Sequence, residues 1–299
     1  MSNLTNNPVQ KPSKSQTQSG KASNLLFPYS VRVSDSGQLY VTDTYNHRIR
    51  RAEKGTLAFF AGGTDGLSLR SPTDTALAPN GDMFMTSPDH NRIMVQSKKS
   101  GLSKEFKLSR LDDSSDSRIL SPTQLDIFEN HLYISDTLQD KIIVVDLDTK
   151  KGCSFSVPRP LGIAVNRVTR EITFTMRGSN AISVWRNGQV TTLAGSALSG
   201  LIDGTTTATF FEPYGLSAGA DGSIYVADAG NHAVRVIDPD LRVVTLAGDG
   251  SKGQDDGPNG TFNYPMGVSS APDGCLYVAD TYNHSIRKVL PNLEVETVF

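Results

Sequence analysis

Three Asn-His pairs are the residues of this sequence that are most able to do chemistry. They occur in "YVTDTYNHRI", which begins at residue 40, in "YVADAGNHAV", which begins at residue 225, and in "YVADTYNHSI", which begins at residue 277. In each copy an aspartate precedes the asparagine by three positions. Imidazole, amide and carboxylate groups at this spacing can bind a metal ion, move a proton or hold a turn by hydrogen bonds. The elements that position them decide between these roles.

Six proline-led segments place the pairs in a repeating framework. The prolines stand at positions 28, 72, 122, 160, 213 and 265, and each opens a short strand that is followed by a turn and an apolar strand such as "GQLYVTD" or "GSIYVAD". The spacing of the prolines fits one four-stranded antiparallel blade per repeat. The sequence therefore predicts an all-β fold, a six-bladed β-propeller of four-stranded antiparallel blades over residues 25–299.

The composition and the first residues set further expectations. The chain is 37% hydrophobic with a net charge of -2, as in an ordinary globular protein. No window approaches the roughly 18 apolar residues that a membrane-spanning helix needs, so we expect no membrane association. Residues 1–24 are rich in Ser, Gln, Asn and Lys, which predicts a disordered tail. We expect an intracellular, cytoplasmic location, because the two cysteines make no disulfide framework, although sequons at Asn3, Asn259 and Asn283 leave export open.

The repeats resemble the NHL repeat, which is named for its Asn-His-Leu signature. The resemblance covers residues 27–299 and is most specific in the first, fifth and sixth repeats. The second repeat has Ser87 in place of aspartate and reads "DHNRI", the third reads "LQDKI", and the fourth has Met176 and reads "GSNAI". The first repeat opens on its inner strand and the sixth ends on its outer strand at Phe299. We therefore expect the ring to close by apolar packing, helped by "ASNLLF" before the first blade.

The topology of such blades separates two faces. One face carries compact hairpins such as "APNGD" and "GADGS". The other carries the Asn-His turns and the long connections between blades, such as "GSALSGLIDGTTTATFFE", and long loops are common binding elements. The alternative is structural, with Asp43, Asp136, Asp228, Asp280 and the Asn-His pairs holding their turns. On the long-loop face we predict a partner-binding surface formed by Tyr45, Asn46, His47, Arg48, His90, Arg92, Arg177, Asn231, His232, Tyr282, Asn283 and His284.

Enzyme chemistry has a weaker basis in the residues. Equivalent histidines on adjacent blades would lie about 10 Å apart, too far to share one zinc ion, and His131 falls in a turn on the hairpin face. A calcium site at the central channel would use Asp74, Gln124 and Asp126, with Arg32 opposing it. Gly248, Gly250 and Gly253 fit G-x-G-x-x-G, but the following "QDDGPNG" does not open a helix. We expect no metal and no cofactor.

Nucleic acid is a further alternative, because some NHL propellers bind RNA through a basic face. Four basic residues would lie on the long-loop face, namely Arg48, Arg92, Lys141 and Arg177. Seven acidic residues would accompany them, namely Asp65, Asp112, Asp113, Asp116, Asp203, Asp255 and Asp256. We therefore do not expect nucleic-acid binding. The preferred hypothesis is a non-enzymatic module or scaffold that binds a protein or peptide; a metal-dependent lyase or hydrolase is the first alternative and an RNA-binding protein the second.

Overall fold

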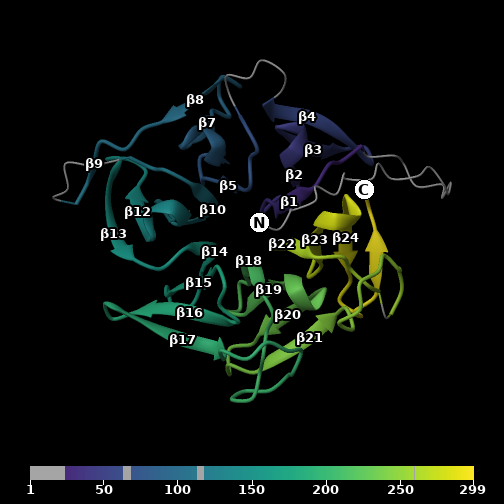
Figure 1. Cartoon of the computed structure of the whole chain (residues 1–299). Coiled ribbons are helices and arrows are strands. Elements are labelled where there is room, and N and C mark those ends of the chain that lie inside the picture. Colours follow the sequence, from purple (N-terminus) through teal and green to yellow (C-terminus); the bar gives the residue numbers. More distant parts are fainter. Residues whose placement is uncertain (1–23, 63–68, 113–117, 259) are drawn as a thin grey trace, which may run out of the picture.

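Six sheets are arranged in a ring around a central axis (Figure 1). The computed structural model describes residues 24–62, 69–112, 118–258 and 260–299. Each repeat forms one antiparallel sheet whose first strand is innermost, and the predicted six-bladed β-propeller is confirmed. The predicted disordered tail lies outside the described residues, except for Asn24.

The blades follow the chain in order. The first three comprise β1 (Pro28–Val33), β2 (Leu39–Asp43), β3 (Arg48–Glu53) and β4 (Thr56–Gly62); β5 (Thr75–Leu77), β6 (Met83–Ser87), β7 (Arg92–Gln96) and β8 (Ser103–Phe106); and β10 (Pro122–Phe128), β11 (His131–Asp136), β12 (Lys141–Asp146) and β13 (Lys151–Ser156). The last three comprise β14 (Pro160–Val165), β15 (Ile172–Met176), β16 (Ala181–Arg186) and β17 (Gln189–Gly195); β18 (Pro213–Ala218), β19 (Ile224–Asp228), β20 (Ala233–Ile237) and β21 (Val243–Ala247); and β22 (Pro265–Ser270), β23 (Leu276–Asp280), β24 (Ser285–Val289) and β25 (Val295–Thr297).

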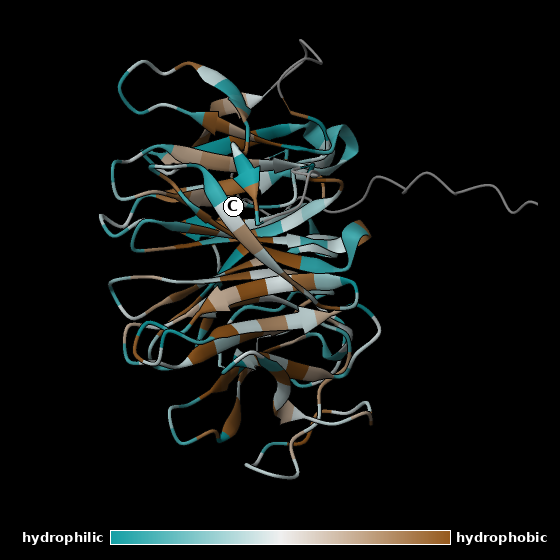
Figure 2. Cartoon of the chain, turned by 90° about the vertical axis from the view of Figure 1, so that its left-hand side faces the viewer, coloured by the Kyte–Doolittle hydropathy of each residue, from teal (hydrophilic) through white to brown (hydrophobic). Residues whose placement is uncertain are grey.

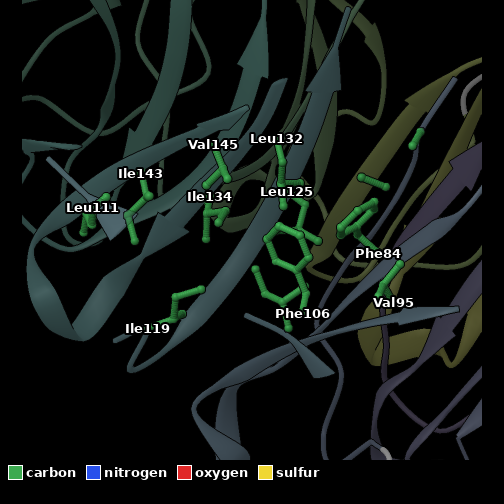
Figure 3. Close-up of a cluster of buried hydrophobic side chains, with 13 residues drawn as sticks. Phe84, Val95, Phe106, Leu111, Ile119, Leu125, Leu132, Ile134, Ile143 and Val145 are labelled. Atoms are coloured by element: carbon green, nitrogen blue, oxygen red, sulfur yellow. The ribbon is translucent and has the colours of Figure 1, made fainter. Parts of the chain in front are cut away.

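The hydrophobic core lies between neighbouring blades. In the side view of Figure 2 the strands run between two loop-covered faces, and hydrophobic and hydrophilic residues alternate along them. Figure 3 shows one layer of the core, in which Phe84 and Phe106 of blade two face Leu125 and Ile134 of blade three. The two phenylalanine rings meet edge to face with centroids 5.1 Å apart. Because both faces of a blade are apolar, each blade is stable only between two neighbours.

Glycines let three inner strands approach closely. A Cβ atom added at Gly162, Gly215 or Gly267 would lie 2.1, 2.4 or 2.7 Å from a backbone oxygen of the next blade. In the other blades side chains bridge the same gap, as where the Asp74 carboxylate accepts a hydrogen bond from Leu125 N at 2.9 Å. The inner strands are thus packed backbone to backbone on one half of the ring and joined by polar side chains on the other.

The ring closes between blades six and one without exchange of strands, as the order of the repeats predicts. β1 to β4 form one sheet and β22 to β25 form another. The Thr281 hydroxyl donates to Pro28 O at 2.8 Å, and Val33 N donates to the Ser269 hydroxyl at 3.1 Å. Leu25 is buried in one cluster with residues of blades one and six, so the segment before the first blade does contribute to closure.

The long connections between blades do more than form loops on one face, because three of them pair with the outer strands of blades. The connection into blade three forms β9 (Arg110–Leu111), which pairs in parallel with β13 and gives that blade a fifth strand. The connections into blades five and six form single antiparallel bridges, Gly204 with Val243 and Gly257 with Val295. These connections therefore cover the outer edges of blades, which otherwise expose unpaired backbone groups.

Candidate functional site

Five aromatic side chains form a continuous row on the face that carries the Asn-His turns. We call Phe27, Tyr29, Tyr45, Tyr264 and Tyr282 the aromatic arc. The row runs from Tyr29 to Tyr45 at 6.3 Å, then to Phe27 at 5.0 Å, to Tyr282 at 5.4 Å and to Tyr264 at 5.2 Å, measured between ring centroids. Tyr45 and Tyr282 are 54% and 51% exposed, so the row presents aromatic surface to solvent.

The turns that hold the arc are built on buried aspartates. Asp43, Asp228 and Asp280 end the second strands of blades one, five and six, and none of the three is exposed to solvent. Each carboxylate accepts a hydrogen bond at 2.8 Å from the turn asparagine three positions later. Each also accepts from a backbone N–H of the preceding connection, as at Leu26 N, 2.9 Å from Asp43 Oδ1.

Short helices form these turns. Single-turn 3-10 helices occupy η1 (Thr44–Asn46), η2 (Pro88–His90), η3 (Thr137–Gln139), η4 (Ala229–Asn231) and η5 (Thr281–Asn283). Tyr45 and Tyr282 are the central residues of η1 and η5, where a side chain points away from the sheet and remains exposed. The residue that follows each of these helices takes a left-handed conformation, for example His47 with φ of 55°.

The three signature histidines connect neighbouring blades. Nδ1 of His47, His232 and His284 accepts a hydrogen bond from the backbone N–H of Ser71, Tyr264 and Phe27, respectively, at 3.0, 2.9 and 3.0 Å. Burial lowers the pKa of His232 and of His284, which favours the neutral ring that such an acceptor requires. These imidazoles hold the face together, and a direct role of the histidines in partner binding stays a prediction.

The backbone N–H groups that donate to these histidines belong to residues with a strained backbone conformation. Phe27, Ser71 and Tyr264 each precede the proline of a repeat and have φ of 48°, 46° and 53°, a region that residues with a side chain seldom adopt. This conformation projects Phe27 and Tyr264 into the arc, beside the tyrosines of the turns. The arc therefore depends on the turn of one blade and the pre-proline residue of the next.

Tyrosine hydroxyls gather beside the inner strands at this face. Burial and the neighbouring Tyr45 and Tyr214 raise the pKa of Tyr29. Burial raises the pKa of Tyr214 to about 12, although the Arg177 guanidinium works in the opposite direction. Burial and a 2.5 Å hydrogen bond to Glu212 Oε2 raise the pKa of the Tyr264 hydroxyl. All three hydroxyls remain protonated at neutral pH and can act as hydrogen-bond donors.

The polar residues of the channel are engaged between strands. Asp74 accepts from the Ser30 hydroxyl at 2.5 Å, and Asp126 accepts from Val165 N and Arg167 Nη2, both at 2.8 Å. Gln124 Oε1 accepts from Ile163 N at 3.2 Å. In the described part of the chain, no group of three or more His, Cys, Asp or Glu residues could hold a metal ion. The oxygens that the sequence offered to calcium join inner strands instead.

The charges of this face are partly neutralised inside the fold. Asp203 accepts from Arg235 and Asp256 accepts from Arg287, each at 2.7 Å, and both arginines are fully buried. Arg48 forms an ion pair with Asp43 at 3.1 Å. Asp112 accepts from Ser154, while Asp65, Asp113 and Asp116 lie outside the described residues. Asp203 and Asp256, two of the seven acidic residues that the sequence places on this face, thus form ion pairs with buried arginines.

The structure brings some predicted site residues together and leaves others apart. Tyr45, Tyr282 and His284 surround Phe27, whose ring meets the His284 ring at 4.4 Å. His90 and Arg92 form a separate pair on blade two, 3.1 Å apart. Asn46, Asn231 and Asn283 are used inside their turns. Sequence reasoning missed Phe27, Tyr29, Tyr214 and Tyr264, although the aromatics beside prolines in "FPY", "EPY" and "YPM" were a usable signal.

Comparison with known families supports the repeat assignment. Residues 25–51, 212–237 and 262–289 match the family model described as NHL repeat. A segment of 80 residues is 46% identical to NHL repeat-containing protein 2 of Bos taurus. This match covers 25% of this chain and 11% of that protein. Another 80-residue match, 41% identical, covers 26% of this chain and 8% of protein SUPPRESSOR OF QUENCHING 1, chloroplastic, of Arabidopsis thaliana. The matches thus span about a tenth of these relatives.

Solved structures with the same fold include a binding protein and a lyase. An auxiliary nutrient binding protein of Bacteroides thetaiotaomicron superposes with a TM-score of 0.72 at 16% identity, over 92% of this chain and 70% of that chain. A virginiamycin B lyase of Staphylococcus aureus superposes with a TM-score of 0.61 at 18% identity, over 92% and 85%. At these identities the likeness shows the fold alone.

Within the described residues, no helix is long and apolar enough to span a bilayer.

Proposed function

We propose that this chain, a six-bladed propeller built of NHL repeats, is a non-enzymatic module that binds a protein or peptide segment on its aromatic arc. The observation that carries the proposal is the unbroken row of five rings across blades six and one, two of them half exposed. Tyrosines supply large, rigid contact area with little loss of conformational freedom, and they are enriched at the energetic centres of interfaces.

The surroundings of the arc favour a peptide with both apolar and polar groups. The rings offer faces on which a proline or an aromatic side chain can pack, as in domains that bind extended proline-rich segments. Tyr29 and Tyr214 add hydroxyl donors, and Arg177 lies close enough to Tyr214 to affect its pKa. The arc is also preorganised, because its turns are fixed by buried carboxylates, which reduces the entropy lost on binding.

The enzyme alternative lacks an observation of comparable weight. The lyase among the solved neighbours shares the fold at 18% identity. In this chain the channel oxygens of Asp74, Gln124 and Asp126 accept backbone N–H groups of the adjacent inner strands. A substrate at the channel mouth would have to compete with these bonds, whereas a ligand on the arc would not.

The test is a double substitution with a matched control. Tyr45→Ala with Tyr282→Ala removes the two exposed rings, and Leu138→Ala changes the central residue of η3, which is 73% exposed at the equivalent position of blade three. Peptides are selected from a random phage-displayed library against the unaltered protein and measured by fluorescence anisotropy. We expect the double variant to weaken binding at least about tenfold and Leu138→Ala to leave it unchanged.

Folding is monitored in the same variants. Each tyrosine makes two ring contacts, so the double variant should lose about 1–3 kcal/mol of unfolding free energy and remain folded. Selected peptides that bind the folded double variant as tightly as the unaltered protein would place the docking surface elsewhere.

A further inference from the structure

Two arginines of blade four lie on the face that carries the aromatic arc, and we call Arg159 and Arg177 the arginine pair. Arg159 precedes the proline that opens β14 and has φ of 44°, the same left-handed conformation that Phe27 and Tyr264 of the arc adopt. Arg177 directly follows β15 and donates its backbone N–H to Arg159 O at 2.9 Å. Both side chains are exposed. The fold thus brings two cationic side chains to neighbouring positions on this face.

The arginine pair carries charge that the described part of the chain does not neutralise. Within residues 24–62, 69–112, 118–258 and 260–299, neither guanidinium forms an ion pair or a hydrogen bond. The buried Arg235 and Arg287 are instead paired with aspartates, and Arg48 is paired with Asp43 on the same face. The pair is therefore available to an acidic group from outside the fold.

A tyrosine hydroxyl accompanies the arginine pair. The Thr175 hydroxyl donates to Tyr214 O at 2.8 Å, which places the start of β18 beside the segment that leads to Arg177. In the described part of the chain the Tyr214 hydroxyl has no hydrogen-bond partner. Arg177 lies close enough to oppose the rise that burial causes in the pKa of Tyr214. Guanidinium and hydroxyl groups are the donors that form charge-assisted hydrogen bonds with a carboxylate.

Blade five connects the arginine pair to the arc. Blades four, five, six and one follow one another around the ring (Figure 1). Asn180, three positions after Arg177, accepts from Glu212 N at 3.2 Å, and Glu212 Oε2 accepts from the Tyr264 hydroxyl at 2.5 Å. Packed sheets lie about 10 Å apart, so blades four and six are separated by about 20 Å or less, a span of about four to six residues of extended chain.

We propose that the segment bound on the aromatic arc is an acidic peptide, in which an Asp or Glu side chain docks on Arg159, Arg177 and Tyr214. This inference rests on the proposed function, because the arc supplies the other half of the contact. The acid would stand about four to six residues from the side chain that packs on the arc. A carboxylate suits this face better than nucleic acid, since a phosphate backbone needs clustered positive charge along its path and would meet Glu212 between the pair and the arc.

Peptide selection provides the first test. Against the unaltered protein, we expect the phage-displayed library to yield peptides with Asp or Glu about four to six residues from a proline or an aromatic residue. The combination Arg159→Gln with Arg177→Gln should abolish this enrichment. The control, Lys99→Gln with Lys104→Gln, removes the same charge from exposed positions of blade two and should retain it. No enrichment with the unaltered protein, or enrichment that survives in the arginine variant, would overturn the proposal.

A double-mutant cycle tests whether the acid meets the arginines. The tightest selected peptide is synthesised with a C-terminal amide, once with its acid and once with the corresponding Asn or Gln, and binding is measured by fluorescence anisotropy. We expect the peptide change and the arginine variant each to weaken binding at least about fivefold, and the two together to weaken it little more than either alone. Losses that multiply would show that the two groups do not interact. Both arginines are exposed, so the variant should keep its Tm within about 2 °C.

The outcomes separate this inference from the proposed function. If Tyr45→Ala with Tyr282→Ala weakens binding and the arginine variant does not, the arc is the docking surface and the arginine pair is no part of it. If neither variant weakens binding, both proposals are wrong. Single-stranded oligouridylate serves as a further probe. Its binding to the unaltered protein, with loss of binding in the arginine variant and no acidic peptides selected, would assign the pair to nucleic acid and overturn the inference.

Discussion

At the scale of single residues, the position after the turn supplies an acceptor in blades one, three, four, five and six, and this acceptor need not be an imidazole. His47, His232 and His284 accept the N–H of the pre-proline residue of the next blade. In the less regular repeats, Asp140 accepts from Arg159 N at 2.8 Å and Asn180 accepts from Glu212 N at 3.2 Å. The signature histidine is thus one of several side chains that can stabilise a strained backbone position.

This role predicts a pH dependence. Burial lowers the pKa of His284 and His232 below that of the unfolded chain, so the unfolded state binds more protons between the two values. The stabilisation that the neutral histidines contribute is fully present above about pH 6.5 and is lost as the pH falls through the pKa of the folded state. Asp228 acts in the opposite direction in this range, because burial raises its folded pKa to about 6, so the test compares variants. Between pH 7.5 and pH 5.5 we expect a smaller fall in Tm for His284→Asn, which keeps an acceptor, than for the unaltered protein. His131→Asn is the control, and equal falls in both variants would contradict this account.

The sequence predicted part of the arc for a physical reason. Tyr45 and Tyr282 adjoin the recognisable Asn-His turns, and the structure leaves both exposed. Phe27 and Tyr264 stand just before the prolines that open inner strands, and their projection onto the face requires the positive φ at that position. Such a backbone state depends on an acceptor from the preceding blade, and a sequence read one repeat at a time does not reveal it.

At the scale of elements, close approach of inner strands decides where glycine is required. A Cβ at Gly215 would lie 2.4 Å from Met266 O, a backbone atom that cannot move aside. A Cβ at Gly219 of the same blade would meet the carboxylate end of Asp221, which can move. We expect Gly215→Ala to cost about 1–3 kcal/mol and Gly219→Ala less than about 1, measured by urea unfolding. A smaller loss in Gly215→Ala than in Gly219→Ala would show that the inner strands have room to separate.

The sequence predicted the strands of the blades but not the structure of the connections between blades. Alternation and turn signals predicted four strands per blade, whereas β9 and the bridges at Gly204 and Gly257 arise in segments without periodicity. Arg235 and Arg287 looked like ordinary strand charges, yet both are fully buried against acids of those connections. These contacts join a connection to a strand that lies about 30 to 40 residues further along the chain, so they form only in the folded ring.

At the scale of the whole molecule, closure depends on apolar packing between the two ends of the propeller. Leu25 is 6% exposed and packs in one cluster with Ala279 and Ile286, whereas the adjacent Leu26 is 40% exposed. We expect Leu25→Ala to lower the free energy of unfolding by about 2–4 kcal/mol and Leu26→Ala to change it by less than about 0.5. Chemical denaturation measures both, and similar values would mean that closure does not depend on this segment.

If a peptide docks on the face that bears the aromatic arc, as proposed above, its binding should slow backbone hydrogen–deuterium exchange on that face. The probe is the tightest peptide selected from the phage library. We expect slower exchange around Phe27 to Tyr29, at Tyr45 and at Tyr282, and unchanged exchange in the hairpins at residues 34–38 and 78–82. Protection of those hairpins, with no change around Tyr45 and Tyr282, would contradict it.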